Sequence, residues 1–182
     1  MVWRALRVPA AALVLLAASC SAQERPAASR PDTAQHGAWT VSARGMGPLI
    51  AGMTMEEARA ALGSDLTEPA DSECAYVTSE DGPAAMRIMI VDGRVARVEV
   101  HDTTVTTAAG ARVGDSEARV QSLYAGRVEV TPHKYTQGHY LTVMPAAPAD
   151  SQFRLVFETD SGRVTTFRAG LLPMVEWVEG CS

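Results

Sequence analysis

The sequence predicts an α+β fold made of two tandem units, each a short helix packed on an antiparallel β-sheet. A complete helix pattern occurs at residues 52–63 (GMTMEEARAALG), and a second version of it occurs at residues 114–125 (GDSEARVQSLYA). Each helix pattern is followed by a β-rich hairpin pattern, at residues 85–100 and 153–169. Because a solenoid generally needs three or more repeats, we interpret the chain as a duplicated α+β unit.

The first helix is predicted from its two ends and its apolar spacing. Thr54 is an N-cap residue whose hydroxyl can accept from the backbone N–H of Glu57, while the Glu57 carboxylate reaches back to the N–H of Thr54. Gly63 ends the helix because glycine adopts the left-handed conformation without a Cβ clash. The apolar residues that recur at helical spacing and define the buried stripe are Met55, Ala58 and Leu62.

The second helix repeats this pattern with a weaker start. Ser116 takes the place of the threonine cap, but Arg119 stands where the first helix has its capping glutamate. Val120 and Tyr124 fall at the positions of the buried stripe, and Gly126 follows as the terminating residue. We therefore expect the same helix at both places, with a complete capping box only in the first.

Both hairpins are predicted from turn residues that lie between two β-rich runs. The first turn is Asp92-Gly93 and the second is Ser161-Gly162, each followed by Arg-Val at the start of the next strand. Aspartate followed by glycine between two strand-like runs is one of the strongest short-range hairpin signals. The remaining predicted strands lie at residues 40–43, 73–79, 127–130 and 139–144.

The strand that follows the first turn shows a period-two pattern. Arg97, Glu99 and His101 alternate with small apolar residues. Such alternation is typical of a strand with one packed face and one solvated face, so we expect these three side chains to be solvated. Residues 102–109 (DTTVTTAA) are expected to form a polar connector to the second helix.

The domain organisation follows from these elements and from the N-terminal composition. Residues 1–20 are interpreted as a lipoprotein signal peptide, with a short basic start and an apolar run too short to span a bilayer. Residues 21–38 are rich in Ala, Ser, Pro and charge, which predicts a flexible tether. The first repeat is assigned to residues 39–106, and the second repeat, with a hairpin insertion, to residues 107–182.

The end of the signal segment resembles a bacterial lipobox. Small residues precede Cys20 in the sequence Ala-Ala-Ser-Cys, and the resemblance implies that Cys20 is lipidated and becomes the mature N-terminus. Ser21 is not the aspartate associated with inner-membrane retention, so the resemblance implies the outer membrane, facing the periplasm. The alternative is cleavage after Ala22 by ordinary signal peptidase, which would give a soluble periplasmic protein.

Two further cysteines, Cys74 and Cys181, remain in the predicted globular part. An exported protein with two cysteines most often pairs them, so we predict a disulfide between them; the alternative is two reduced thiols. No C-x-x-C motif occurs, which argues against a redox or metal role.

Charge and motif content exclude several classes of function. The net charge of −5 comes with no basic stripe of the kind that nucleic-acid binding needs. The sequence contains no G-x-S-x-G, H-E-x-x-H, phosphate-loop or dinucleotide-binding pattern. We therefore predict a protein that is not an enzyme, with no catalytic residues, no cofactor and no bound metal.

The unusual stretch of the chain is residues 133–140 (HKYTQGHY), where two histidines, two tyrosines and the single lysine surround a predicted turn. The candidate partner-binding residues are His133, Lys134, Tyr135, His139 and Tyr140. A four-residue loop would place His133 opposite Tyr140, and a two-residue loop would place Tyr135 opposite Tyr140. Three interpretations remain open: a recognition surface, since tyrosine gives rigid amphipathic contact area; a two-histidine metal site without an evident third ligand; and a structural edge hairpin.

A family resemblance adds to this interpretation. The pattern Gly52-Met53-Thr54, Glu57 and Leu62-Gly63, followed by strands on a chain with a lipobox, resembles the SmpA/OmlA (BamE-like) group of small outer-membrane lipoproteins. The duplication and the expected disulfide are similar to the tandem β-lactamase-inhibitor-protein (BLIP-like) fold. The resemblance implies a helix packed on a short antiparallel sheet. It implies no binding residue by position.

The expected function is that of a lipid-anchored envelope protein acting as a non-enzymatic protein-binding or assembly module. Its expected partners are an envelope protein and, through the N-terminal lipid, a membrane. A second interpretation is a glycan-binding module, lectin-like or directed at peptidoglycan, that uses the Tyr/His hairpin. A third is an inhibitor of a periplasmic or foreign enzyme.

Overall fold

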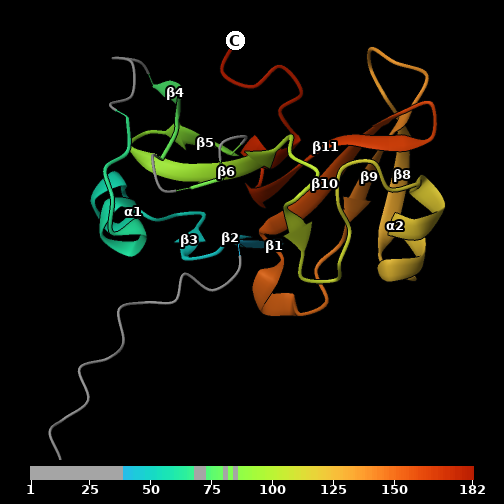
Figure 1. The fold of residues 1–182 in the computed structure, drawn as a ribbon, viewed down its shortest axis with the longest axis horizontal. Coiled ribbons are helices and arrows are strands. Elements are labelled where there is room, and N and C mark those ends of the chain that lie inside the picture. Colours follow the sequence, from blue (N-terminus) through green and yellow to red (C-terminus); the bar gives the residue numbers. More distant parts are fainter. Residues whose placement is uncertain (1–38, 68–72, 80–81, 84–85) are drawn as a thin grey trace, which may run out of the picture. The chain divides into compact units, whose positions relative to one another are not determined.

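The computed structural model describes residues 39–67, 73–79, 82–83 and 86–182 of the chain. The predicted signal peptide with Cys20 and the predicted tether lie outside the described residues. The described part has an α+β fold that is mostly β, with two α-helices and two sheets (Figure 1). The helices are α1 (Met55–Leu62) and α2 (Glu117–Leu123).

The larger sheet contains seven strands, all antiparallel to their neighbours. In chain order they are β4 (Cys74–Val77), β5 (Met86–Val91), β6 (Arg94–Val100), β8 (Val128–Pro132), β9 (His139–Val143), β10 (Phe153–Asp160) and β11 (Arg163–Leu171). Their order in the sheet is β4-β5-β6-β11-β10-β9-β8. The two long hairpins therefore meet at the centre, where Glu99 of β6 lies opposite Arg168 of β11.

The smaller sheet comes mainly from the start of the described part. Its strands are β1 (Thr40–Ser42), β2 (Gly45–Met46), β3 (Leu49–Ile50) and β7 (Thr106–Thr107). Two short 3-10 helices, η1 (Pro148–Asp150) and η2 (Met174–Glu176), complete the described elements.

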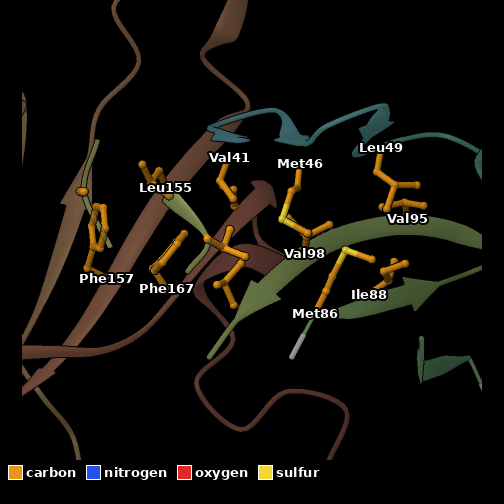
Figure 2. Packing of buried hydrophobic residues seen from close by; sticks show 14 of the residues in the cluster. Val41, Met46, Leu49, Met86, Ile88, Val95, Val98, Leu155, Phe157 and Phe167 are labelled. Carbon is orange, nitrogen blue, oxygen red and sulfur yellow. The ribbon is translucent and has the colours of Figure 1, made fainter. Parts of the chain in front are cut away.

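A single apolar cluster joins the two sheets and the helices. Figure 2 shows Val41, Met46 and Leu49 of the smaller sheet packed toward side chains of the larger sheet. Phe157 and Phe167 are fully buried, with ring centroids 5.4 Å apart. The helices add Ala58, Leu62, Val120 and Tyr124 to the cluster. One face of the larger sheet is thus covered by the core, which leaves the opposite face for other contacts.

The starts of both helices and the end of α1 confirm the capping predictions, whereas α2 ends at the C-cap Tyr124 and not at the expected Gly126. Thr54 accepts from the N–H of Glu57 at 3.2 Å and donates its own N–H to the Glu57 carboxylate at 2.8 Å, a complete capping box. Gly63 ends α1 at φ 68°. In α2, Ser116 accepts from the N–H of Arg119 at 3.2 Å, without the reciprocal bond. The second cap is therefore the weaker one.

Both predicted hairpin turns are present and have the same conformation. Asp92 and Gly93 have φ of 50° and 72°, and Ser161 and Gly162 have φ of 50° and 75°. Two consecutive positive φ values are characteristic of a type I′ turn, whose twist matches that of the flanking strands. Each hairpin also has a register shift at the same place relative to its turn, in β5 and in β10.

The two helices are joined to the two hairpins by matching backbone contacts. Gly52 donates its N–H to the carbonyl of Val95 at 2.7 Å, and Gly114 donates to that of Val164 at 2.8 Å. The carbonyl of the residue before each cap accepts a hydrogen bond in return: Val95 donates to Met53 at 2.8 Å, and Val164 donates to Asp115 at 2.9 Å. Each helix therefore starts directly beside the turn of the hairpin that follows it.

The predicted disulfide is present in the structure. Cys74 of β4 and Cys181 are bonded at an S–S distance of 2.01 Å, across a sequence separation of 107 residues. The bond fixes the C-terminal segment, residues 172–182, to the edge strand of the larger sheet.

The predicted polar connector at residues 102–109 is only partly polar. It contains β7, and Thr107 is buried at 2% exposure. The Tyr124 hydroxyl donates to Thr107 Oγ1 at 2.7 Å, and this oxygen also accepts from the N–H of Ala111 at 3.0 Å. The threonine-rich sequence suggested a solvent-exposed segment, but the hydroxyl of Thr107 has hydrogen-bond partners inside the core.

Candidate functional site

The hairpin that carries the candidate residues closes in a register that differs from both predictions. Pro132 pairs with His139, so the loop between β8 and β9 spans the six residues 133–138. Neither the opposition of His133 and Tyr140 nor that of Tyr135 and Tyr140 occurs. The predictions were wrong because the hairpin closes in another register, in which the N–H of His133 donates to the Gly138 carbonyl at 3.0 Å.

His133 is the centre of the loop. Its Nδ1 accepts from the backbone N–H groups of Tyr135 and Thr136, at 3.0 and 3.1 Å. An Nδ1 that accepts is unprotonated in a neutral ring, so Nε2 carries the proton and faces Glu158 Oε2 at 3.3 Å. The ring also stacks on Tyr140 with centroids 4.5 Å apart. Both ring nitrogens are thus occupied in shaping the loop.

Lys134 and Tyr135 lie at the exposed end of the loop. Tyr135 is 60% exposed, the largest value among the exposed large hydrophobic side chains of the described part. Lys134 Nζ lies 5.0 Å from the centroid of the Tyr135 ring and 2.8 Å from Glu179 Oε1. The loop therefore presents an aromatic ring beside a cation, with the C-terminal segment next to it.

The His139 side chain points to the face of the larger sheet on which α2 lies. Its Nδ1 lies 2.9 Å from Glu117 Oε1, which also accepts from the Thr159 hydroxyl at 2.5 Å. Burial raises the pKa of Glu117, but the bonds from Thr159 and His139 outweigh it, so the net shift is downward. His139 thus connects the base of the hairpin to the first turn of α2, and the structure does not bring the two histidines together. Among the described residues, no three His, Cys, Asp or Glu side chains gather as a metal-binding group.

A groove runs over the face of the larger sheet that is opposite the core, between β8 and the C-terminal segment. Its volume is about 270 Å3. It is lined by Glu129, Thr131, Tyr140, Thr142, Met144, Arg154, Val156, Arg168, Glu176 and Val178. Only Tyr140 was singled out from the sequence. The alternation of Tyr140, Thr142 and Met144 with buried Leu141 and Val143 is the sequence signal that marks this face.

The C-terminal segment is held over this face by two buried arginines. Arg97 Nη1 donates to the carbonyls of Met174 and Trp177 at 2.7 and 2.6 Å, and Arg168 Nε donates to Val175 at 2.6 Å. Arg168 also forms an ion pair with Glu158. These bonds pair backbone carbonyl groups of the segment and so hold it against the sheet.

The expectation that Arg97 and Glu99 are solvated was wrong. Their exposures are 2% and 7%, because the C-terminal segment covers them. Burial raises the pKa of Glu99, but His101, Arg97 and Tyr76 outweigh it and lower the pKa to about 2. The bonds from Arg97 Nη2 and the Tyr76 hydroxyl are both 2.5 Å long, whereas His101 Nε2 lies 3.7 Å away, so we assign the stabilisation mainly to the first two. Glu99 is therefore ionised and fully engaged.

Comparison with known proteins adds little to this geometry. No family model and no curated protein matches the chain. Among solved structures, the chain is similar to the uncharacterized protein yfeY from Escherichia coli, with 16% identity and a TM-score of 0.44 over 72% of this chain and 99% of that one. Within the described residues, no helix has the length and apolar character required to cross a membrane.

Proposed function

We propose that this protein is a non-enzymatic binding module of the cell envelope that holds another protein at its β8–β9 hairpin. The observation that carries the proposal is the braced loop at residues 133–138, which exposes Tyr135 beside Lys134. The side chain of His133 and its contact with Glu158 fix this loop before any partner arrives. A rigid loop loses less entropy on binding, and tyrosine is enriched among the residues that dominate binding energy.

The location is part of the proposal. We assign residues 1–20 to a signal peptide, Cys20 to lipidation and residues 21–38 to a tether, which together would place the module on the periplasmic face of the outer membrane. The Cys74–Cys181 disulfide supports an oxidising compartment, because such bonds persist outside the cytosol.

We also propose that the fold arose from two tandem units, residues 39–106 and 107–182. The matching caps, turns, register shifts and helix-to-hairpin bonds support this. The pairing of β4 with β5 corresponds to that of β9 with β10, so β8 is the strand that the first unit lacks. Under this proposal the candidate hairpin is an addition to the second unit.

The proposal is tested by site-specific photocrosslinking in the cells that make the protein. A photoreactive phenylalanine analogue at Tyr135 is expected to yield an adduct with an envelope protein. The same analogue at Gln121, an exposed residue of α2, is the matched control and is expected to yield none. A Tyr135 probe that captures no protein would overturn the proposed function.

A glycan is the second candidate occupant, favoured by the groove. Its lining combines Tyr140 with Thr131, Thr142 and Arg154, side chains that can stack on a sugar ring and bond its hydroxyls. Binding of peptidoglycan fragments or arrayed glycans that is lost with both Tyr140→Ala and Arg154→Ala would support this candidate. Inhibition of a foreign or periplasmic enzyme would be one form of the protein-binding function, and an enzyme-inhibition assay on a crosslinked partner checks it.

A further inference from the structure

We infer that the outer edge of β8 binds an extended segment of the partner protein, which adds to the larger sheet as a further strand and places a basic residue opposite Glu129. The inference rests on the proposed protein-binding function and specifies the geometry and chemistry of the contact. It follows from the hydrogen-bond register, the side-chain alternation and the unpaired charge of β8.

The register shows which backbone groups of β8 face outward. Met144 donates to Arg127 at 2.7 Å and His133 donates to Gly138 at 3.0 Å, and these two pairs continue the β8–β9 register by one residue beyond each end. Bonded and non-bonded pairs alternate along an antiparallel ladder. Residues 129 and 131 therefore also bond to β9, while the backbone groups of residues 128, 130 and 132 point away from it.

These outward groups form an open edge. Val128 and Val130 each offer an N–H and a carbonyl, and Pro132 offers only a carbonyl, so the proline ends the available edge. Among the described residues, no backbone or side-chain group pairs with them. At the other edge of the sheet, Thr67 donates to the Thr78 carbonyl at 3.1 Å beside β4. An uncovered strand edge is a template for pairing with another chain.

The side chains of β8 define what an added strand must contain. Val128 packs partly on the core and Val130 is 43% exposed on the same face, whereas Glu129 and Thr131 line the groove. Because side chains alternate along a strand, residues opposite Val128 and Val130 would extend the apolar face. The residue between them would enter the groove beside Glu129. The expected segment therefore alternates apolar and polar residues.

The unpaired carboxylate of Glu129 selects a basic residue at that position. Within the described part of the chain, the Glu129 and Glu176 carboxylates have no ion pair or hydrogen bond, and they line the same groove. Two cations line the same groove: Arg168 is paired with Glu158, and Arg154 donates to the backbone carbonyls of Ser151 and Phe153. Glu129 would occupy a non-bonded pair of the new ladder, where facing side chains approach most closely. Opposite charges in such a pair stabilise it.

A second copy of this chain matches the edge less well. In an antiparallel pairing centred on Glu129, two carboxylates would face each other. In one centred on Val130, Pro132 would stand opposite Val128 and leave the outward carbonyl of Val128 without a donor. A partner segment with a lysine or arginine avoids both conflicts.

The test uses the purified full chain and two synthetic peptides of about nine alternating valine and threonine residues, one with a central lysine and one with a central glutamate. Fluorescence polarisation at low salt is expected to show about three- to tenfold tighter binding of the lysine peptide. Glu129→Lys is expected to reverse this preference. Val130→Pro removes an outward N–H without breaking the β9 ladder and is expected to abolish binding, while the matched control Val130→Thr keeps the N–H and retains binding.

Several results would overturn the inference. These are no binding of either peptide, equal binding of both, or binding that persists in a folded Val130→Pro variant. If circular dichroism shows that Val130→Pro does not fold, the inference is judged by whether Glu129→Lys reverses the preference for the lysine peptide. A partner captured at Tyr135 whose capture is unchanged in Glu129→Lys and Val130→Pro would overturn strand addition while leaving the proposed function intact. A dimer of the chain that Val130→Pro dissociates would overturn the assignment of the edge to a partner.

Discussion

In the first half of the described fold, α1 begins beside the β5–β6 turn, and in the second half α2 begins beside the β10–β11 turn. The bonds between helix and hairpin are the same in both halves, down to an arginine after each turn that donates to the glycine before each cap: Arg94 to Gly52 at 2.9 Å, and Arg163 to Gly114 at 3.0 Å. The similarity shows that the start of each helix is fixed to the following hairpin by the same set of hydrogen bonds.

The two halves differ where the sheet ends. The first half ends at β4, which is linked to Cys181 and has Thr67 bonded beside it. The second half continues through β9 to β8, whose outer edge carries Val130 at 43% exposure. The helix-to-hairpin bonds are the same in both halves, whereas the two edges of the larger sheet differ. The β8 edge and the loop that follows it are therefore where the second half departs from the first.

The largest expected loss of stability comes from removing the disulfide at the β4 edge. Cys181→Ala removes a link across 107 residues, and closed loops of this length contribute about 4 kcal/mol to the free energy of unfolding. Urea unfolding with and without reductant measures the loss. Amide exchange is expected to rise more in β4 than in β9. Equal exchange in both strands would show that the disulfide does not stabilise the first edge selectively.

The next effect concerns the central pair of strands, where Glu99 and Arg168 occupy matching positions in the two hairpins and face each other. The pKa of Glu99 in the folded protein, about 2, lies below its ordinary value of 4.5. Its stabilisation is therefore fully present above pH 4.5 and is lost as the pH falls toward 2. The shift corresponds to about 3 kcal/mol.

Glu99→Gln is expected to lower the free energy of unfolding at neutral pH by about 3 kcal/mol, because Arg97 would remain buried without an anion. Urea midpoints measured between pH 7 and pH 2 check this. The variant is also expected to lose part of the decline in stability below pH 4.5. An acid profile identical to that of the unaltered chain would show that Glu99 is not the group whose protonation matters.

The local elements could be predicted from the sequence because their causes lie within a few residues. The Thr54 capping box and the two type I′ turns need only neighbouring side chains and positive φ values. The α+β class follows from the same signals. The link between Cys74 and Cys181 was predictable because an expected exported location suggested pairing and only these two cysteines were left to pair.

The candidate site was harder to predict because its geometry depends on distant contacts. The conformation of the loop depends on His133, which stacks on Tyr140 and faces Glu158, a residue on another strand. Arg97 and Glu99 alternate like solvated residues but are covered by a segment about 80 residues later in the chain. Strand periodicity identifies a polar face but not what lies on it.

A smaller effect sharpens the comparison of the two caps. Thr54→Ala removes a complete capping box and Ser116→Ala a single bond, so we expect losses of about 1.5 and 1 kcal/mol. Thermal unfolding of both variants gives the two values. Thr54→Ser and Ser116→Thr, which keep the accepting hydroxyl, are the matched controls. A larger loss of stability in Ser116→Ala than in Thr54→Ala would contradict the expectation that the reciprocal bond makes the first cap the stronger one.

The smallest expected effect tests whether the two joints are energetically alike. Arg94→Ala and Arg163→Ala each remove one solvent-exposed bond to a glycine carbonyl, so we expect each to lower the free energy of unfolding by about 0.5 to 1 kcal/mol. The double variant is expected to lose the sum, because the two arginines share no partner and independent sites add. Chemical unfolding of both single variants and the double variant measures this. Losses that differ more than twofold would mean that the two halves keep the same contacts but no longer depend on them equally.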